Sequence, residues 1–173
     1  TLREYGYRNF LSLELRITRD GKGHVIDPCM RAGSPPAELQ GLMYRNLPDI
    51  FWYGAEGELV DPDPAGKWGA ELLIHSGWAD KNWQAIQFPE HLRENVKLRN
   101  LTVLNGEYYV VPQAVGLPEI GAVVAVGDTL EEACETVCEY AKEVQGYFVD
   151  MFPSSLDEAQ EALVKLKSFG ITL

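Results

Sequence analysis

Hydrophobic and polar residues alternate along residues 10–18, FLSLELRIT, as they do in a half-buried β-strand. One face carries Leu11, Leu13, Leu15 and Ile17, and the other carries Ser12, Glu14 and Arg16. The next residues, RDGKG, contain an Asp-Gly pair of the kind that closes tight turns, and HVID (24–27) returns as a second short strand. The pattern predicts a β-hairpin in which Glu14 and Asp27 meet at the end away from the turn or on the polar face.

A spacing of three and four residues marks the best-defined helix, within residues 127–146. Its apolar stripe is made of Leu130, Ala133, Cys134, Val137, Cys138, Ala141 and Val144. We expect Asp128 or Thr129 to cap this helix and Gly146 to end it.

Weaker patterns fill the rest of the chain. They predict a helix over 35–46 with Ser34 as its N-cap, one or two helical turns over 49–57, and a loop over 59–67. They also predict strands over 69–77 and 119–127, and a hairpin over 97–113 with Asn105–Gly106 at its turn. A last helix is expected from Ser155, in a capping box with Glu158, to near Gly170. The predicted fold is α+β, with an antiparallel sheet and amphipathic helices.

Composition narrows the function classes. The 173 residues include 26 acidic and 15 basic ones, a formal net charge of −11, which argues against binding nucleic acid through a broad basic surface. A nucleotide whose charge metal ions bridge to carboxylates stays compatible. No apolar run approaches the roughly 18 residues of a transmembrane helix, and no signal peptide is present, so no membrane partner is expected. Three cysteines without framework spacing favour a reducing, cytoplasmic setting, with Cys134 and Cys138 in the core.

Two carboxylates at one end of a hairpin, with an arginine four residues on, suit a Mg²⁺–polyphosphate site. Mg²⁺ prefers oxygen ligands and is usually held by one or two carboxylates plus substrate phosphates. Arg31 could neutralise a phosphoryl group during transfer, and Gly33 would let the backbone approach a ligand closely. The alternative is that Glu14 and Asp27 are solvated strand residues and that Arg31 pairs with one of them. His24 borders this region, either touching a substrate or lying at a strand end.

The segment SLELRITRDGKGHVIDPCMRAGSPP (12–36) resembles the end of the nucleotide-binding region of ATP-grasp enzymes. In that superfamily a strand carries a first metal-binding glutamate, here Glu14, and a second strand ends in an acidic residue, here Asp27. An asparagine and an arginine follow at alternate positions, here Cys29 and Arg31. The continuation RAGSPP resembles the RFGDPE type of the glycinamide ribonucleotide synthetase branch. A looser likeness covers residues 10–146.

This resemblance implies an ATP-dependent carboxylate–amine (or thiol) ligase that works through an acyl phosphate. Glu14 and Asp27 would hold Mg²⁺, or alternatively Mn²⁺, and with Arg31 would bind ATP. Arg31 would be the catalytic residue, and a small carboxylate would be the second substrate.

The resemblance also predicts how the chain is organised. Residues 1–47 would end the nucleotide-binding domain, 48–146 would form a C-terminal α+β subdomain, and 147–173 a helical extension. The ATP-cradling elements of the family lie upstream of the matched region. We therefore expect a C-terminal fragment that is inactive alone and acts with N-terminal domains of the same chain. The aromatic segment 50–54 is expected in a buried interface, which a homo-oligomer would supply.

Cys29 stands where the family has a metal-binding asparagine, and a thiol is a poor partner for Mg²⁺. The alternative function is therefore a non-catalytic binding or assembly module that keeps the ATP-grasp-like C-terminal fold.

Overall fold

The computed structural model describes residues 2–112 and 119–171, with Arg3 described by its backbone alone. The helices are η1 (Leu2–Tyr5), α1 (Ala37–Met43), α2 (Leu47–Glu56), η2 (Glu90–Leu92), α3 (Leu130–Glu143) and α4 (Ser154–Ser168). The strands are β1 (Ser12–Ile17), β2 (Gly23–Cys29), β3 (Trp68–Ser76), β4 (Gln84–Gln87), β5 (Val96–Leu98), β6 (Leu101–Leu104), β7 (Glu107–Val110), β8 (Glu119–Gly127), β9 (Gln145–Gly146) and β10 (Val149–Asp150). The predicted α+β class, with antiparallel sheets, is confirmed.

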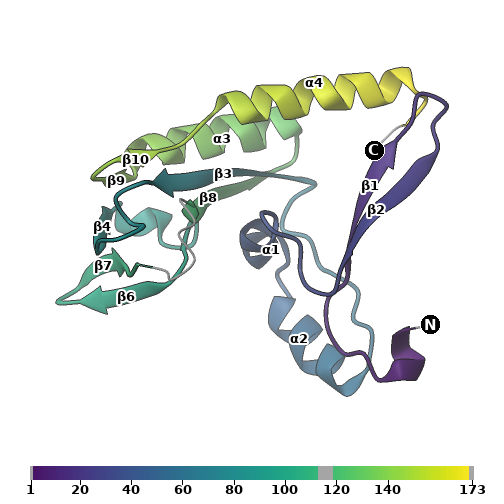
Figure 1. Ribbon diagram of the computed structural model, residues 1–173, viewed down its shortest axis with the longest axis horizontal. Helices are drawn as coiled ribbons and strands as arrows, with labels where there is room; N and C mark the ends of the chain where they lie inside the picture. Colours follow the sequence, from purple (N-terminus) through teal and green to yellow (C-terminus); the bar gives the residue numbers. More distant parts are fainter. Residues whose placement is uncertain (1, 113–118, 172–173) are drawn as a thin grey trace.

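The core lies between α3 and a four-stranded antiparallel sheet of order β10-β3-β8-β5. Strand β3 alternates so that Ala70, Leu72 and Ile74 are buried, while the residues between them are only partly covered. The stripe of α3, including Val137, packs on the sheet in the same core cluster. The two strands predicted over 69–77 and 119–127 form this centre, and the predicted helix covers it (Figure 1).

Helix α1 also packs on β3 and β8. A Cβ added at Gly69 would lie 2.8 Å from the side chain of Leu39, so a larger residue here would displace the Leu39 side chain that packs α1 on the sheet. Helix α1 follows directly on the segment that carries Arg31, one of the predicted site residues.

A second sheet has the order β6-β7-β4-β9. Its β6–β7 hairpin turns at Asn105 and Gly106, with φ of +52° and +83°, as the Asn-Gly pair predicts. The hairpin is shorter than expected, because residues 96–98 form β5, which pairs with β8 instead. Gln113, the end of the predicted hairpin, lies outside the described residues. Strands β4, β9 and β10 were not predicted.

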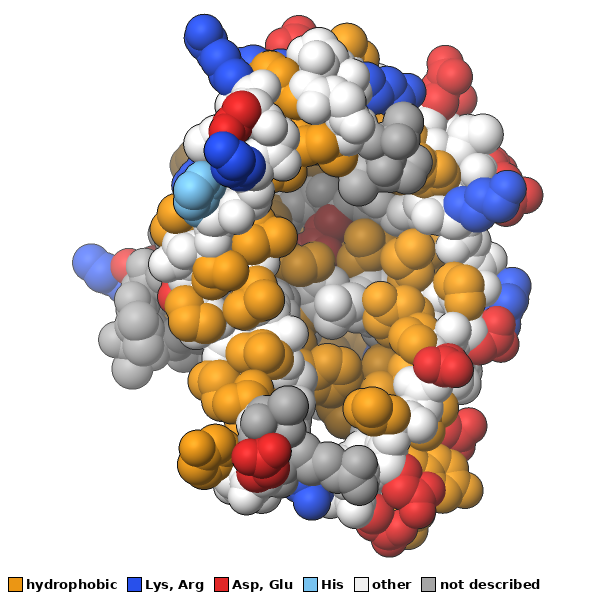
Figure 2. Space-filling view, turned by 90° about the vertical axis from the view of Figure 1, so that its right-hand side faces the viewer, with side chains coloured by type: hydrophobic (Ala, Val, Ile, Leu, Met, Phe, Trp, Pro, Cys, Tyr) orange, Lys and Arg blue, Asp and Glu red, His pale blue; other side chains and the backbone are white. Residues whose placement is uncertain are grey.

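The β1–β2 hairpin projects from the rest of the chain (Figure 1). Its turn lies near the end of α4, where a Cβ on Gly21 would be 3.6 Å from the carbonyl oxygen of Phe169. Apolar side chains of both strands, including Leu15 and Val25, remain exposed. Figure 2 shows hydrophobic side chains around a hollow on this side of the molecule. The predicted hairpin is confirmed, but its apolar face is not covered by the described residues.

Several expected helix ends differ from the structure. Thr129 caps α3 by accepting a hydrogen bond from the Glu132 amide, but α3 ends at Glu143, and Gly146 belongs to β9. Neither Ser34 nor Ser155 is an N-cap. Helix α1 begins after Pro36, without a side-chain cap.

At the start of α4 a proline takes the place of the expected capping box. Pro153 already has helical backbone angles, and the hydroxyl of Ser155 donates to the carbonyl of Phe152. The position of the proline, rather than that of the serine, therefore sets where this helix begins.

Cys134 is buried and Cys138 is partly buried beside the core, as expected for cysteines that pack in the interior. Among the described residues, no helix is long and apolar enough to cross a membrane. The division at residues 47 and 146 stays a prediction.

Candidate nucleotide and metal site

The register of the β1–β2 hairpin places Glu14 directly opposite Asp27. Cross-strand neighbours lie on the same face of a sheet, with their Cβ atoms about 4.5–5.5 Å apart. A bulge follows immediately, where the pairing shifts between Glu14 and Leu15. Both carboxylates are exposed. The structure thus brings together the two acidic residues that the sequence singles out.

Two like charges directly opposite each other destabilise a hairpin, so each needs a partner. Glu14 has one on its own strand, because Nη2 of Arg16 lies 2.8 Å from Oε1 of Glu14. Asp27 accepts a hydrogen bond from the thiol of Cys29, with Sγ 3.1 Å from Oδ2. This hydrogen bond to Asp27, aided by burial, raises the pKa of the Cys29 thiol, so the thiol stays protonated. The thiol is a donor here and not a metal ligand.

Arg31 lies two residues beyond β2 and is exposed. Its Nη1 donates to the carbonyl oxygen of Ala32 at 2.9 Å. Within the described part of the chain, Arg31 forms no ion pair with Glu14 or Asp27. The structure therefore does not show the alternative in which Arg31 neutralises one of these carboxylates. The guanidinium of Arg31 remains available to a ligand.

Glu14 and Asp27 fit a magnesium ion that is bound together with a nucleotide. No group of three His, Cys, Asp or Glu side chains among the described residues could form an all-protein metal site. Two facing carboxylates are nevertheless enough where phosphate oxygens and water complete the octahedron. Glu14 and Asp27 are the residues that would hold it.

The segment after Arg31 is closely packed on itself and also touches β1. A Cβ on Gly33 would lie 3.0 Å from Cγ of Pro36 and 3.8 Å from Cβ of Ser12. Gly33 therefore allows a close approach within the protein, whereas the sequence suggested an approach to a ligand. His24 is exposed and pairs with Arg16 in the register, so its contact with a substrate stays a prediction.

An ion-pair cluster, which was not predicted, fastens α1 to the sheet. Nε of Arg99 lies 2.6 Å from Oε1 of Glu38, and its Nη1 lies 3.0 Å from Oε2 of Glu119. Glu71 on β3 joins the cluster, where its Oε2 accepts the amide of Leu39 at 3.3 Å. Burial, followed by the charge of Glu38, raises the pKa of Glu71 from 4.5 to about 7. This cluster links the segment that carries Arg31 to the C-terminal sheet.

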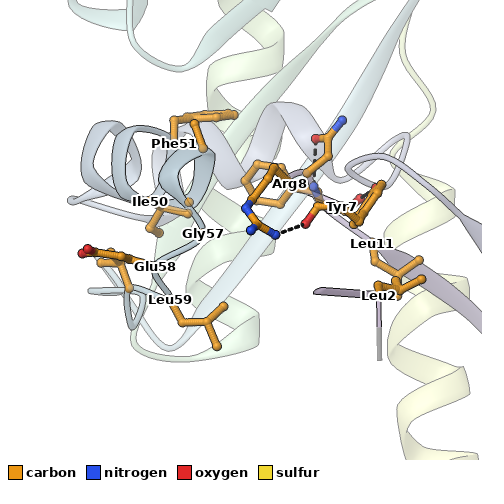
Figure 3. A pocket seen from close by; sticks show the side chains of 14 residues that line it. Leu2, Tyr7, Arg8, Leu11, Ile50, Phe51, Gly57, Glu58 and Leu59 are labelled. Carbon is orange, nitrogen blue, oxygen red and sulfur yellow. Dashed lines mark hydrogen bonds between the residues drawn. The ribbon is translucent and has the colours of Figure 1, made fainter. Parts of the chain in front are cut away.

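A cavity of about 480 Å³ lies apart from these residues, between η1, the start of β1 and α2. Figure 3 shows side chains of Ile50 and Leu59 on one side and those of Tyr7 and Leu11 on the other, with Arg8 between them. Nη1 of Arg8 donates to the carbonyl oxygen of Tyr7 at 3.0 Å. Neither the two carboxylates nor Arg31 lines this cavity.

Phe51 and Trp52, from the segment 50–54, are 56% and 70% exposed on α2. Burial of this segment in an interface stays a prediction.

No protein-family model matches the sequence, and no curated protein matches it. Among solved structures, the chain is similar to phosphoribosylamine–glycine ligase from Thermotoga maritima, with a TM-score of 0.64 and 18% sequence identity. The similarity covers 82% of this chain and 35% of that structure, so the chain spans about a third of the length of the ligase. The likeness confirms the predicted α+β fold and shows that the chain shares the fold of part of this ligase.

Proposed function

We propose that the chain is the C-terminal part of an ATP-dependent ligase, which activates a carboxylate as an acyl phosphate and joins it to an amine or a thiol. The proposal includes the branch, that of the glycinamide ribonucleotide synthetases. It rests on the fold shared with a solved ligase and on the motif of residues 12–36.

One observation carries the proposal: the hairpin register sets Glu14 opposite Asp27, with Arg31, which forms no ion pair within the described residues, close by in the chain. Facing carboxylates destabilise a hairpin. Arg16 offsets the charge of Glu14, but Asp27 has no cationic partner among the described residues. The register therefore supports a cation site at the place where the resemblance expects one.

Each residue then has a distinct role. Glu14 and Asp27 would hold Mg²⁺, which supplies charge compensation for the phosphates of ATP when bound. Arg31 would place its guanidinium on the transferred phosphoryl group, where fixed positive charge stabilises the developing negative charge. The contacts of Arg99 with Glu38 would hold α1, and with it the Arg31 segment, against the sheet.

The exposed apolar surfaces support the expectation of further domains. Leu13, Leu15 and Val25 are 50%, 52% and 56% exposed on the hairpin. Exposed apolar surface of this kind marks contact sites. In the proposal, the N-terminal nucleotide-binding domains cover this hairpin and complete the ATP site.

The test is carboxylate-dependent ATP hydrolysis by the complete gene product. Glu14→Gln keeps the size of the side chain but removes its charge, and it should reduce turnover by at least about 100-fold, since metal-held phosphate charge is then uncompensated. Glu107→Gln, on the exposed β6–β7 hairpin, is the matched control and should leave turnover unchanged. Normal turnover by Glu14→Gln with an unaltered Mg²⁺ requirement would refute the assignment.

A second candidate, a non-catalytic module, is favoured by one observation. The Cys29 thiol donates a hydrogen bond to Asp27. Cys29 stands at the position where the family has a metal-binding asparagine. Cys29→Asn separates the two candidates, because it restores an oxygen ligand. A working metal site should bind Mg·ADP more tightly in this variant, whereas a module that has lost the metal site should bind it no more tightly than wild type.

A further inference from the structure

Helix α1 begins without a cap from its own segment. Its N-cap residue is Pro36, a proline, whose side chain has no hydrogen-bond acceptor. The amides of the first helical turn have no partner within a helix, so they need acceptors from elsewhere. Leu39 is the third residue of α1, the position whose amide an N-cap side chain usually satisfies. The acceptor for this amide must therefore come from another element.

Strand β3 supplies that acceptor. Oε2 of Glu71 accepts a hydrogen bond from the Leu39 amide at 3.3 Å, although the two residues are 32 positions apart in the chain. Gly69, which shares a face of β3 with Glu71, lies against the side chain of the same leucine. Glu71 thus does for α1 what the hydroxyl of Thr129 does for α3.

The preceding residue of α1 is held to the sheet as well. Oε1 of Glu38 lies 2.6 Å from Nε of Arg99, and Nη1 of Arg99 lies 3.0 Å from Oε2 of Glu119 on β8. Two successive residues of the first turn are therefore fixed, Glu38 through Arg99 and Leu39 through Glu71. The contact of Leu39 with Glu71 is partly buried, so an amide that lost this acceptor would be poorly satisfied by water.

The anchored end of α1 is also the end that carries the Arg31 segment. Only four residues separate Arg31 from Pro36, the N-cap residue of the helix. Within them a Cβ on Gly33 would lie 3.0 Å from Cγ of Pro36 and 3.8 Å from Cβ of Ser12 on β1, the strand that also carries Glu14. Because the segment is this short and this closely packed, the position of the helix start determines where Arg31 lies.

We infer that Glu71 is a positioning residue of the ligase reaction, which caps α1 and thereby sets the place of the Arg31 guanidinium. The inference rests on the proposed function, because it needs Arg31 to act in phosphoryl transfer. Catalysis of that transfer is largely positioning and fixed charge, and a displacement of about 1 Å can cost about 100-fold in rate. The role requires the side-chain oxygen of Glu71 and not its charge, because a carboxyl oxygen and an amide oxygen both accept an N–H.

The experiment compares two replacements of Glu71 in the complete gene product. Glu71→Leu removes the acceptor at nearly constant size, whereas Glu71→Gln keeps an oxygen and removes only the charge. We expect Glu71→Leu to lower kcat for ATP turnover at least about tenfold while KM for ATP changes less than about threefold, because the contact of Arg31 with the transferred group matters most in the transition state. Glu71→Gln should keep the kcat and KM of wild type.

The matched control removes the cap of the other helix. Thr129→Ala takes away the hydroxyl that accepts the Glu132 amide at the start of α3. Loss of this cap should cost stability to a similar degree. It should leave kcat unchanged, because α3 packs on the core face of the sheet, opposite to the face that carries Glu71.

Two NMR measurements on the same proteins need no ATP. Hydrogen exchange of the Leu39 amide should be at least about tenfold faster in Glu71→Leu than in wild type. The Nε–H signal of Arg31 should shift in Glu71→Leu and keep its place in Glu71→Gln and Thr129→Ala.

The inference is overturned if Leu39 exchanges equally in Glu71→Leu and wild type, or if the Arg31 signal does not move. It is also overturned if kcat of Glu71→Leu is normal, or if it falls equally in Thr129→Ala. Failure of the proposed function shows separately, as normal turnover by Glu14→Gln. The two NMR results would still decide whether Glu71 caps α1 and places Arg31.

Discussion

The fold raises the pKa of the Glu71 carboxyl group, and this gives the stability of the chain a measurable pH dependence. Its folded pKa of about 7 lies above the ordinary 4.5, so the folded state holds a proton that the unfolded state releases between these values. Stability must then fall as the pH rises from about 4.5 to about 7 and stay at the lower level above that. Replacing Glu71 by Gln removes the ionisation while keeping an oxygen that accepts the Leu39 amide.

The size of the effect follows from the two pKa values. At about 1.4 kcal/mol per pH unit, the difference between 4.5 and about 7 corresponds to about 3 kcal/mol for a fully desolvated group. Glu71 is only partly buried, and solvent screening reduces this to about 1–2 kcal/mol. We expect the gain in unfolding free energy from Glu71→Gln to be larger by that amount at pH 8.5 than at pH 5.

Urea denaturation of both proteins at the two pH values is the assay, with Glu158→Gln as the control for loss of an exposed carboxylate on α4. Comparing variant with wild type at each pH cancels the titration of all other groups. The reasoning is refuted if Glu71→Gln changes stability equally at pH 5 and pH 8.5, because the carboxyl would then ionise alike in both states.

Two further predictions concern the ion-pair cluster and the thiol. Arg99→Ala should lower the unfolding free energy, measured by urea denaturation, by about 2–3 kcal/mol, since it leaves Glu38 with an uncompensated, largely buried charge. Arg99→Lys should restore part of this loss. A loss below about 0.5 kcal/mol in Arg99→Ala would contradict the prediction. Cys29→Asn in the complete gene product should bind Mg·ADP up to about tenfold more tightly by calorimetry, because an oxygen ligand is restored. An affinity that is unchanged or lower would argue against a metal at Asp27.

The hairpin and its carboxylates could be predicted because the signals are local. Alternation fixes which side chains share a face, and the Asp-Gly turn fixes how the strands fold back. From these alone Glu14 and Asp27 fall at the same end of the hairpin. The bulge beside Glu14 has no comparable signature, since an extra residue in a strand leaves the apolar pattern nearly unchanged.

The Arg99 cluster could not be predicted, because it depends on distant pairs. Arg99 and Glu38 are 61 residues apart in the chain, and they meet only because α1 packs across β3 and β8. One local signal was present: Glu71 is a charged residue among the apolar residues of GAELLI, and a charge there needs a partner or a function.

Helix starts were misjudged for a related reason. The serines before α1 and within α4 match capping patterns, but the neighbouring prolines determine where each helix begins. Proline fixes its own φ and lacks an N–H, so it can begin a helix without a cap.

Calorimetric titration of Mg·ADP into the complete gene product, comparing wild type with Glu14→Gln, tests the central claim most directly. The account predicts saturable, Mg²⁺-dependent binding to wild type and an affinity at least about tenfold lower in the variant, because one of two metal-holding carboxylates is lost. Equal binding by both proteins, or binding that does not require Mg²⁺, would contradict the assignment of Glu14 and Asp27 as the metal-holding pair.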